Sequence, residues 1–193
     1  MSQTQDDNNA RSYMLVSTAN YLRHKLGTSE GQRLIDTLSP ETRAILTAEK
    51  PAAWSPMSNY VELLRTVAAL GKGDDAKARD SLIDAGKFVA QEASSTFLRL
   101  FLKMLTPNLF AKKVPSVWSR DFSRGRAEAE ISDQGLVFRM FGISGMDHIP
   151  CTAPGFVTFA METMGKSIKT VTVHKWSLEE PCVDGAYFEL EWG

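Results

Sequence analysis

The residues best able to do chemistry in this sequence are its two cysteines and three histidines. His148 and Cys151 are three positions apart, and His174 and Cys182 follow later in the chain. Cys, His and carboxylate side chains are the ligands of tetrahedral zinc, so these four residues are the candidates for a metal site. Their spacing lacks the C-x₂-C pairs of zinc modules, and free cysteine is commonly a small buried hydrophobic residue. The sequence therefore predicts no metal and no other cofactor, with zinc at these four residues as the alternative.

The same residues could also provide a nucleophile. A thiolate is stabilised at a helix N-terminus, where Cys151 is expected, and His148 could act as its base. The only neighbouring group that could orient His148 is Asp147. This pattern falls short of a nucleophile, base and orienting side chain, so we predict no catalytic residues and no enzyme.

Large aromatic residues give the most informative pattern, because they occur on both predicted helices and predicted strands. Apolar and aromatic side chains line most small-molecule pockets. The same residues also fill close-packed cores, and the sequence leaves both possibilities open. The candidate ligand-binding residues are Phe97, Phe101, Phe138, Phe156 and Phe159.

The elements that must position these residues change in character along the chain. From residue 12 to about residue 121 the apolar positions recur at helical spacing, interrupted by Gly27, by residues 50–56 and by Gly71. After Gly125 the apolar residues alternate with polar ones over about 126–131 and 136–140, and again over 168–176 and 186–192. One helix is expected between Cys151 and Gly165.

The predicted fold class follows from this order. It is α+β, with an N-terminal helical region and a roughly four-stranded antiparallel sheet (β-hairpin, helix, β-hairpin) packed on helices. Residues 1–11 are polar and predict a disordered tail. Residues 12–193 are expected to form a single domain, mainly helical over 12–121 and sheet-containing over 122–193.

Composition excludes several classes of protein. Lys and Arg number 22 against 23 acidic residues, which gives no basic field for nucleic acid. The polar start of the chain does not resemble a signal peptide, and no apolar run approaches the ~20 residues of a membrane span. We expect a cytoplasmic protein without nucleic-acid partners or a membrane span.

Scattered Gly, Pro, Trp and Cys positions carry a resemblance to known proteins. The chain resembles a family of myxobacterial proteins and, more distantly, the 4-vinyl reductase, haem-NO-binding and TRAPP-type fold group. The segments that carry the resemblance are Leu38-Ser39-Pro40-Glu41, Trp54-Ser55-Pro56, Val114-Pro115-Ser116-Val117-Trp118, Cys182-Val183-Asp184-Gly185 and Phe188-Glu189-Leu190-Glu191-Trp192.

The resemblance implies a fold that binds a small apolar molecule between helices and sheet, or that pairs with a partner subunit. Its haem-binding branch needs an axial His, for which His24, His148 and His174 are the candidates, and a Tyr-x-Ser-x-Arg anchor. The segment Asp121-Phe122-Ser123-Arg124 departs from that anchor, so no haem is expected.

The resulting interpretation is a non-catalytic small-molecule-binding or sensing module that binds a small apolar ligand and acts through a protein partner or as a homodimer. The alternatives are a structural adaptor that dimerises through its helices or sheet with no ligand, and a zinc-supported sensor.

Overall fold

The computed structural model describes residues 8–193, apart from the side chains of residues 96–98 and 101. The helices are α1 (Ser12–Leu26), α2 (Thr28–Asp36), α3 (Pro40–Thr47), α4 (Met57–Ala68), η1 (Ala69–Gly71), α5 (Asp75–Ala93), α6 (Thr96–Met104), α7 (Pro107–Asp121) and α8 (Ile149–Thr163). The strands are β1 (Asn9–Arg11), β2 (Trp54–Pro56), β3 (Arg126–Ile131), β4 (Gly135–Phe141), β5 (Ile168–His174) and β6 (Tyr187–Trp192). None of the helices among the described residues is long and apolar enough to cross a membrane.

The helices of the N-terminal half begin and end at residues whose side chains favour those positions. The Ser39 hydroxyl accepts a hydrogen bond from the Thr42 backbone N–H at 3.2 Å, and so caps α3. Asp74 caps α5 in the same way, accepting from Lys77 at 3.0 Å. Gly27 ends α1 with a φ of 84°, a conformation that glycine adopts without strain.

The C-terminal half contains a four-stranded antiparallel sheet in the order β3-β4-β6-β5. Phe138 of β4 stands opposite Phe188 of β6, and their rings stack with centroids 4.8 Å apart. Phe188, Leu190 and Trp192 are all buried on one face of β6, as the alternating sequence predicted. The predicted α+β fold, with a hairpin, a helix and a second hairpin packed on helices, is confirmed.

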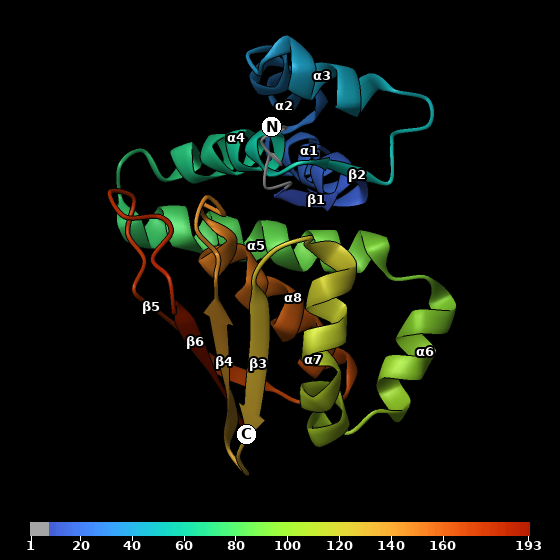
Figure 1. Ribbon diagram of the computed structural model, residues 1–193, viewed down its shortest axis with the longest axis vertical. Coiled ribbons are helices and arrows are strands. Elements are labelled where there is room, and N and C mark those ends of the chain that lie inside the picture. The colour runs from blue at the N-terminus through green and yellow to red at the C-terminus, as the bar shows by residue number, and fades with distance from the viewer. Residues whose placement is uncertain (1–7) are drawn as a thin grey trace, which may run out of the picture.

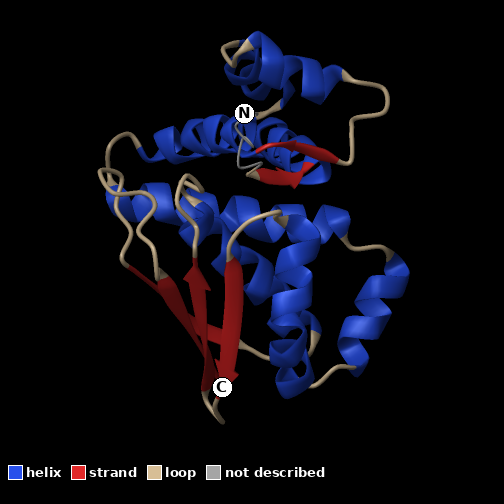
Figure 2. Ribbon diagram, in the orientation of Figure 1, coloured by secondary structure: helices blue, strands red, loops and turns tan. Residues whose placement is uncertain are grey.

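The arrangement of these elements is layered (Figures 1 and 2). Helices α1–α4 gather at one end, and α5 runs between them and the sheet-containing half. α8 packs along α5, α7 lies beside β3, and α6 lies at the outer edge of the molecule. The core therefore continues from the helical region into the inner face of the sheet.

The close approach of α5 and α8 depends on one glycine in each helix. A Cβ atom on Gly86 would lie 2.0 Å from the Thr152 carbonyl oxygen, and one on Gly155 would lie 2.1 Å from the Ile83 carbonyl oxygen. Only a residue without a side chain fits at either point.

Two expectations about the N-terminal half were wrong in part. Residues 50–56 were predicted to be a loop, which holds for residues 50–53 only, and the chain was expected to be disordered up to residue 11. Instead, β1 and β2 form a small antiparallel pair in which Ala10 stands opposite Ser55. Residues 1–7 of the expected tail lie outside the described residues.

Candidate functional site

The candidate site is an apolar cavity of about 180 Å³, partly open to solvent, between α8, α7, α5 and the sheet. Its walls combine residues far apart in the sequence. Met14 comes from α1, Ala90 from α5, Leu102 from α6 and Phe138 from β4. The site is therefore a product of tertiary packing, with α7 and α8 as its main walls.

Helix α8 provides the longest wall of the cavity. Its lining residues recur at the spacing of one helical face. The turn that carries Gly155 packs on α5, so the position of this wall is fixed by backbone contact. The α8 residues that line the cavity are Ile149, Thr152, Ala153, Phe156, Val157, Phe159 and Ala160.

Helix α7 provides the opposite wall. Thr106 caps it, with the hydroxyl accepting from the Leu109 backbone N–H at 3.3 Å. Trp118 packs against Phe122 with ring centroids 4.6 Å apart, and its indole N–H donates to the Arg124 carbonyl at 3.0 Å. The Trp118 ring is therefore held in one orientation at the cavity wall.

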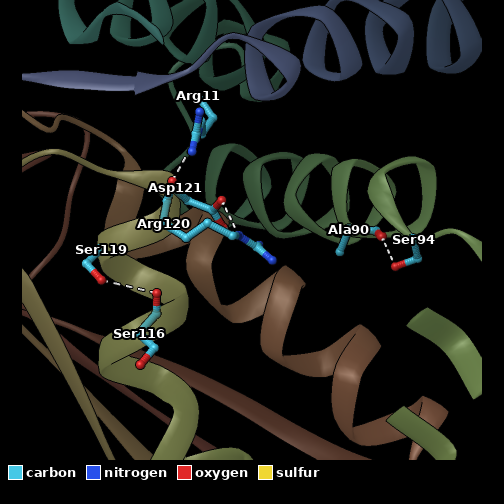
Figure 3. Close-up of polar contacts among 7 residues, drawn as sticks. All are labelled: Arg11, Ala90, Ser94, Ser116, Ser119, Arg120 and Asp121. Carbon is cyan, nitrogen blue, oxygen red and sulfur yellow. Dashed lines mark hydrogen bonds and ion pairs between the residues drawn. The ribbon is translucent and has the colours of Figure 1, made fainter. Parts of the chain in front are cut away.

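One end of the cavity is polar. Arg120 donates two hydrogen bonds to the Asp121 carboxylate, at 2.8 and 2.7 Å, and Arg11 donates to the Arg120 carbonyl at 2.8 Å (Figure 3). Tyr13 lines the same end, and its hydroxyl interacts with Asp121. Burial, together with the Asp121 charge, raises the pKa of Tyr13, so its hydroxyl stays protonated.

The structure places three of the five candidate ligand-binding residues at this cavity. Phe138, Phe156 and Phe159 line it, whereas the side chains of Phe97 and Phe101 lie outside the described part of the chain. The sequence did not single out Tyr13 or Asp121. Tyr13 is one of several large residues on an amphipathic helix. Asp121 follows Arg120 at the end of a predicted helix, where charged residues are common.

The four candidate metal ligands do not form a site in the structure. Among residues 8–193, apart from the four omitted side chains, no group of three or more His, Cys, Asp or Glu residues could hold a metal ion. Cys151 is fully buried in α8, and burial raises the pKa of its thiol. Cys182 is half-buried, with its Sγ 2.7 Å from the Ile143 carbonyl oxygen. The alternative of a zinc-supported sensor therefore has no support from the geometry.

Cys151 and His148 do not have the properties of a nucleophile and base. Burial lowers the pKa of His148 to about 4, an effect that the Asp147 carboxylate partly opposes. The raised pKa of Cys151 keeps it a thiol, and a thiol is a poor nucleophile. Both groups are neutral near pH 7.

Haem, the cofactor of one branch of the fold group that this chain resembles, does not fit the residues of this site. His24 stacks on Phe88, and His174 stacks on Tyr187. His148 lies against Trp176, so none of the three histidines is among the described residues that line the cavity. The volume of about 180 Å³ is also below the ~300–1,000 Å³ of pockets for cofactor-sized ligands.

Comparisons with known proteins show where this fold has been seen before. No protein family and no curated protein matched the sequence. Among solved structures, the chain is similar to an H-NOX protein from S. oneidensis in the Fe(II)NO ligation state. That match has a TM-score of 0.64 and 12% identity, and covers 95% of this chain and 99% of the other.

Two further H-NOX structures match in the same way. Cs H-NOX has a TM-score of 0.64 and 9% identity, covering 94% of this chain and 96% of the other. The H-NOX of T. tengcongensis has a TM-score of 0.63 and 8% identity, covering 94% and 97%. Identities this low establish the fold and not the chemistry. The chain therefore has the fold of H-NOX domains over almost its whole length.

Proposed function

We propose that this protein is a non-catalytic module that binds a small apolar molecule in the cavity between α7, α8 and the sheet, and passes the signal to a protein partner. The observation that carries the proposal is the cavity itself, lined by aromatic and aliphatic side chains from both halves of the chain. The fold shared with H-NOX domains, one of which is described in an Fe(II)NO ligation state, supports a sensing role.

The size of the cavity limits the ligand. Engineered cavities of ~150 Å³ with apolar walls bind benzene or xenon. At about 180 Å³, this cavity accepts a molecule, or an apolar part of one, only slightly larger than benzene. Phe138, Phe156 and Phe159 are the proposed contacts.

The partner surface that we propose is the outer side of α6 and α7. Leu100 and Met104 of α6 are 56% and 82% exposed, and Leu109 and Val117 of α7 are 46% and 41% exposed. Both helices also line the cavity, through Leu102 and Val117 among others. A ligand that shifts either helix would therefore change this apolar surface, and such surfaces commonly mark protein interaction sites.

The proposal is tested with toluene as a probe, by thermal unfolding. Binding to the folded state alone stabilises it by ~2.7 kcal/mol at a hundred times Kd, which corresponds to roughly 5–10 °C for a chain of this size. Ala153→Leu places three more carbon atoms at the cavity wall. This variant should keep its stability and lose the shift with toluene.

The matched control is Ala76→Leu, the same change on the exposed side of α5. It should retain the full shift. Two results together would show a filled core. Saturating toluene would leave the Tm of the parent unchanged, and the Ala153→Leu variant would melt well below the parent. The alternative of an adaptor that dimerises without ligand would then be preferred, and sedimentation of the ligand-free protein would test it.

A further inference from the structure

A second hollow adjoins the apolar cavity on the side of α1. It is a polar cleft of about 850 Å³, lined by residues of α1, by the end of α5 and by residues 51–53 before β2. Tyr13, Ala93, Arg120 and Asp121 line both hollows. The cleft and the cavity therefore meet at a shared wall.

The shared wall presents polar atoms at the boundary between an apolar and a polar space. The Asp121 side chain is only 6% exposed, while that of Arg120 is 54% exposed. Their two hydrogen bonds, together with the interaction of the Tyr13 hydroxyl with Asp121, use three of the roughly four acceptor positions of the carboxylate. Asp121 thus keeps acceptor capacity at the junction, beside the Tyr13 hydroxyl.

The charges of the cleft balance one another. Arg120 is paired with Asp121, and the Arg11 guanidinium lies 4.2 Å from the centre of the Trp54 ring. Glu92 accepts from the Asn20 amide at 3.2 and 3.3 Å. Two cationic and two anionic groups leave no net charge to attract a charged ligand, whereas the carboxylates can accept hydrogen bonds from hydroxyl or amide groups.

We infer that the ligand is an uncharged amphiphile, with a tail of about six to eight carbon atoms in the apolar cavity and a hydroxyl- or amide-bearing head in the polar cleft. The tail length follows from comparing about 180 Å³ with the ~150 Å³ that holds benzene. The inference rests on the proposed function, because it places the apolar part in the same cavity.

The first experiment measures how affinity depends on the length of the ligand's tail and on the charge of its head. n-Alkyl β-D-glucosides from hexyl to decyl are titrated below their micelle concentrations by calorimetry. Affinity should rise about fourfold for each added methylene, the equivalent of ~0.8 kcal/mol, and level off near eight carbons. Octanoate and octylammonium should bind at least tenfold more weakly than octyl glucoside, because a charged head enters a cleft with no net charge.

The second experiment separates the two hollows. Ala52→Trp fills the cleft from its exposed rim, and Ala48→Trp makes the same change on the same loop at an exposed residue that does not line the cleft. Ala52→Trp should weaken octyl glucoside at least tenfold and leave toluene binding unchanged. Ala48→Trp should change neither.

The outcomes distinguish the inference from the function on which it rests. If neither toluene nor any glucoside binds, the proposed function fails and the inference with it. If toluene binds but Ala52→Trp leaves octyl glucoside unaffected, the head does not occupy the cleft and only the inference fails. Tighter binding of octanoate or octylammonium than of octyl glucoside also overturns it, because the ligand is then charged.

Discussion

The contact between α5 and α8 gives a quantitative prediction for Gly155→Ala. On an exposed helix this change would stabilise by roughly 0.5–1 kcal/mol, because alanine has the higher helix propensity. Here the new Cβ would lie 2.1 Å from the Ile83 carbonyl oxygen and 2.5 Å from the Lys87 backbone nitrogen. Both atoms are backbone, so no side-chain rotation can relieve the contact.

The loss of stability in Gly155→Ala follows from the movement of the helices that is needed to relieve this contact. An ordinary contact for a Cβ begins at 3.4 Å, so the two helices must separate locally by about 1.3 Å. A gap of 0.5–1 Å already removes a quarter to a half of the dispersion energy of the atoms facing it. We expect a net loss of ~3 kcal/mol, which is a large part of a typical free energy of unfolding.

Urea denaturation of the variant and the parent provides the measurement. A lower midpoint at unchanged m-value is expected, with a fall in Tm of roughly 6–12 °C. Ala76→Ser is the control, since it adds one heavy atom to an exposed position of α5 and should change stability by a few tenths of a kcal/mol. A midpoint equal to or above that of the parent would show that the helices are not in backbone contact at Gly155.

Three further changes test other parts of the fold. Trp192→Ala should cost ~3–5 kcal/mol in denaturant titration, because the buried ring also donates to the Asp133 carbonyl at 3.1 Å, and a loss below ~1 kcal/mol would contradict the register of β6. His148 has a pKa of about 4 in the folded protein against ~6.5 in the unfolded chain. The free energy of unfolding should therefore be constant above pH ~6.5 and should fall by up to ~3 kcal/mol as the pH drops towards 4. His148→Gln should flatten that pH dependence, and an unaltered slope would argue against burial of the ring. Ser39→Ala should cost ~1 kcal/mol through the loss of the α3 cap, and Ser58→Ala, at an exposed residue of α4, should cost less than half of that.

The strands of the large sheet could be predicted from the sequence because each one has a buried and a solvent-facing side. Alternation along β6 places Phe188 and Leu190 inward and Glu189 and Glu191 outward, and a period of two has no helical interpretation. The helices before them could be predicted because their apolar residues recur at helical spacing and Gly27 and Gly71 interrupt that pattern.

The small sheet could not be predicted, since nothing local specifies it. Each of its strands has three residues, and 42 residues separate the end of β1 from the start of β2. Such short runs carry no period, and Pro56 argues against a strand except at an edge. Its register depends on long-range pairing, such as Asn9 with Pro56, that only the folded chain brings together.

The site was only partly visible in the sequence, for a similar reason. Phe138, Phe156 and Phe159 could be proposed because large aromatic residues on different elements commonly converge, and all three line the cavity. The polar end could not be proposed. Asp121 becomes an acceptor beside the cavity only because α7 brings it against Tyr13 of α1, more than a hundred residues earlier in the chain.

The two faces of α8 together explain why a cavity can persist in this fold. On one face, Gly155 and the Thr152 carbonyl meet the backbone of α5 so closely that the helix cannot move further inward. On the other face, Phe156 and Ala160 line the cavity together with side chains of α7 and α6, which can pack at various distances. A helix fixed on one side cannot shift to fill a space on its other side, so a void there can close only by movement of α6 or α7. Gly155→Ala would free α8 from that constraint, and the loss of stability that we expect should therefore be accompanied by a loss of toluene binding.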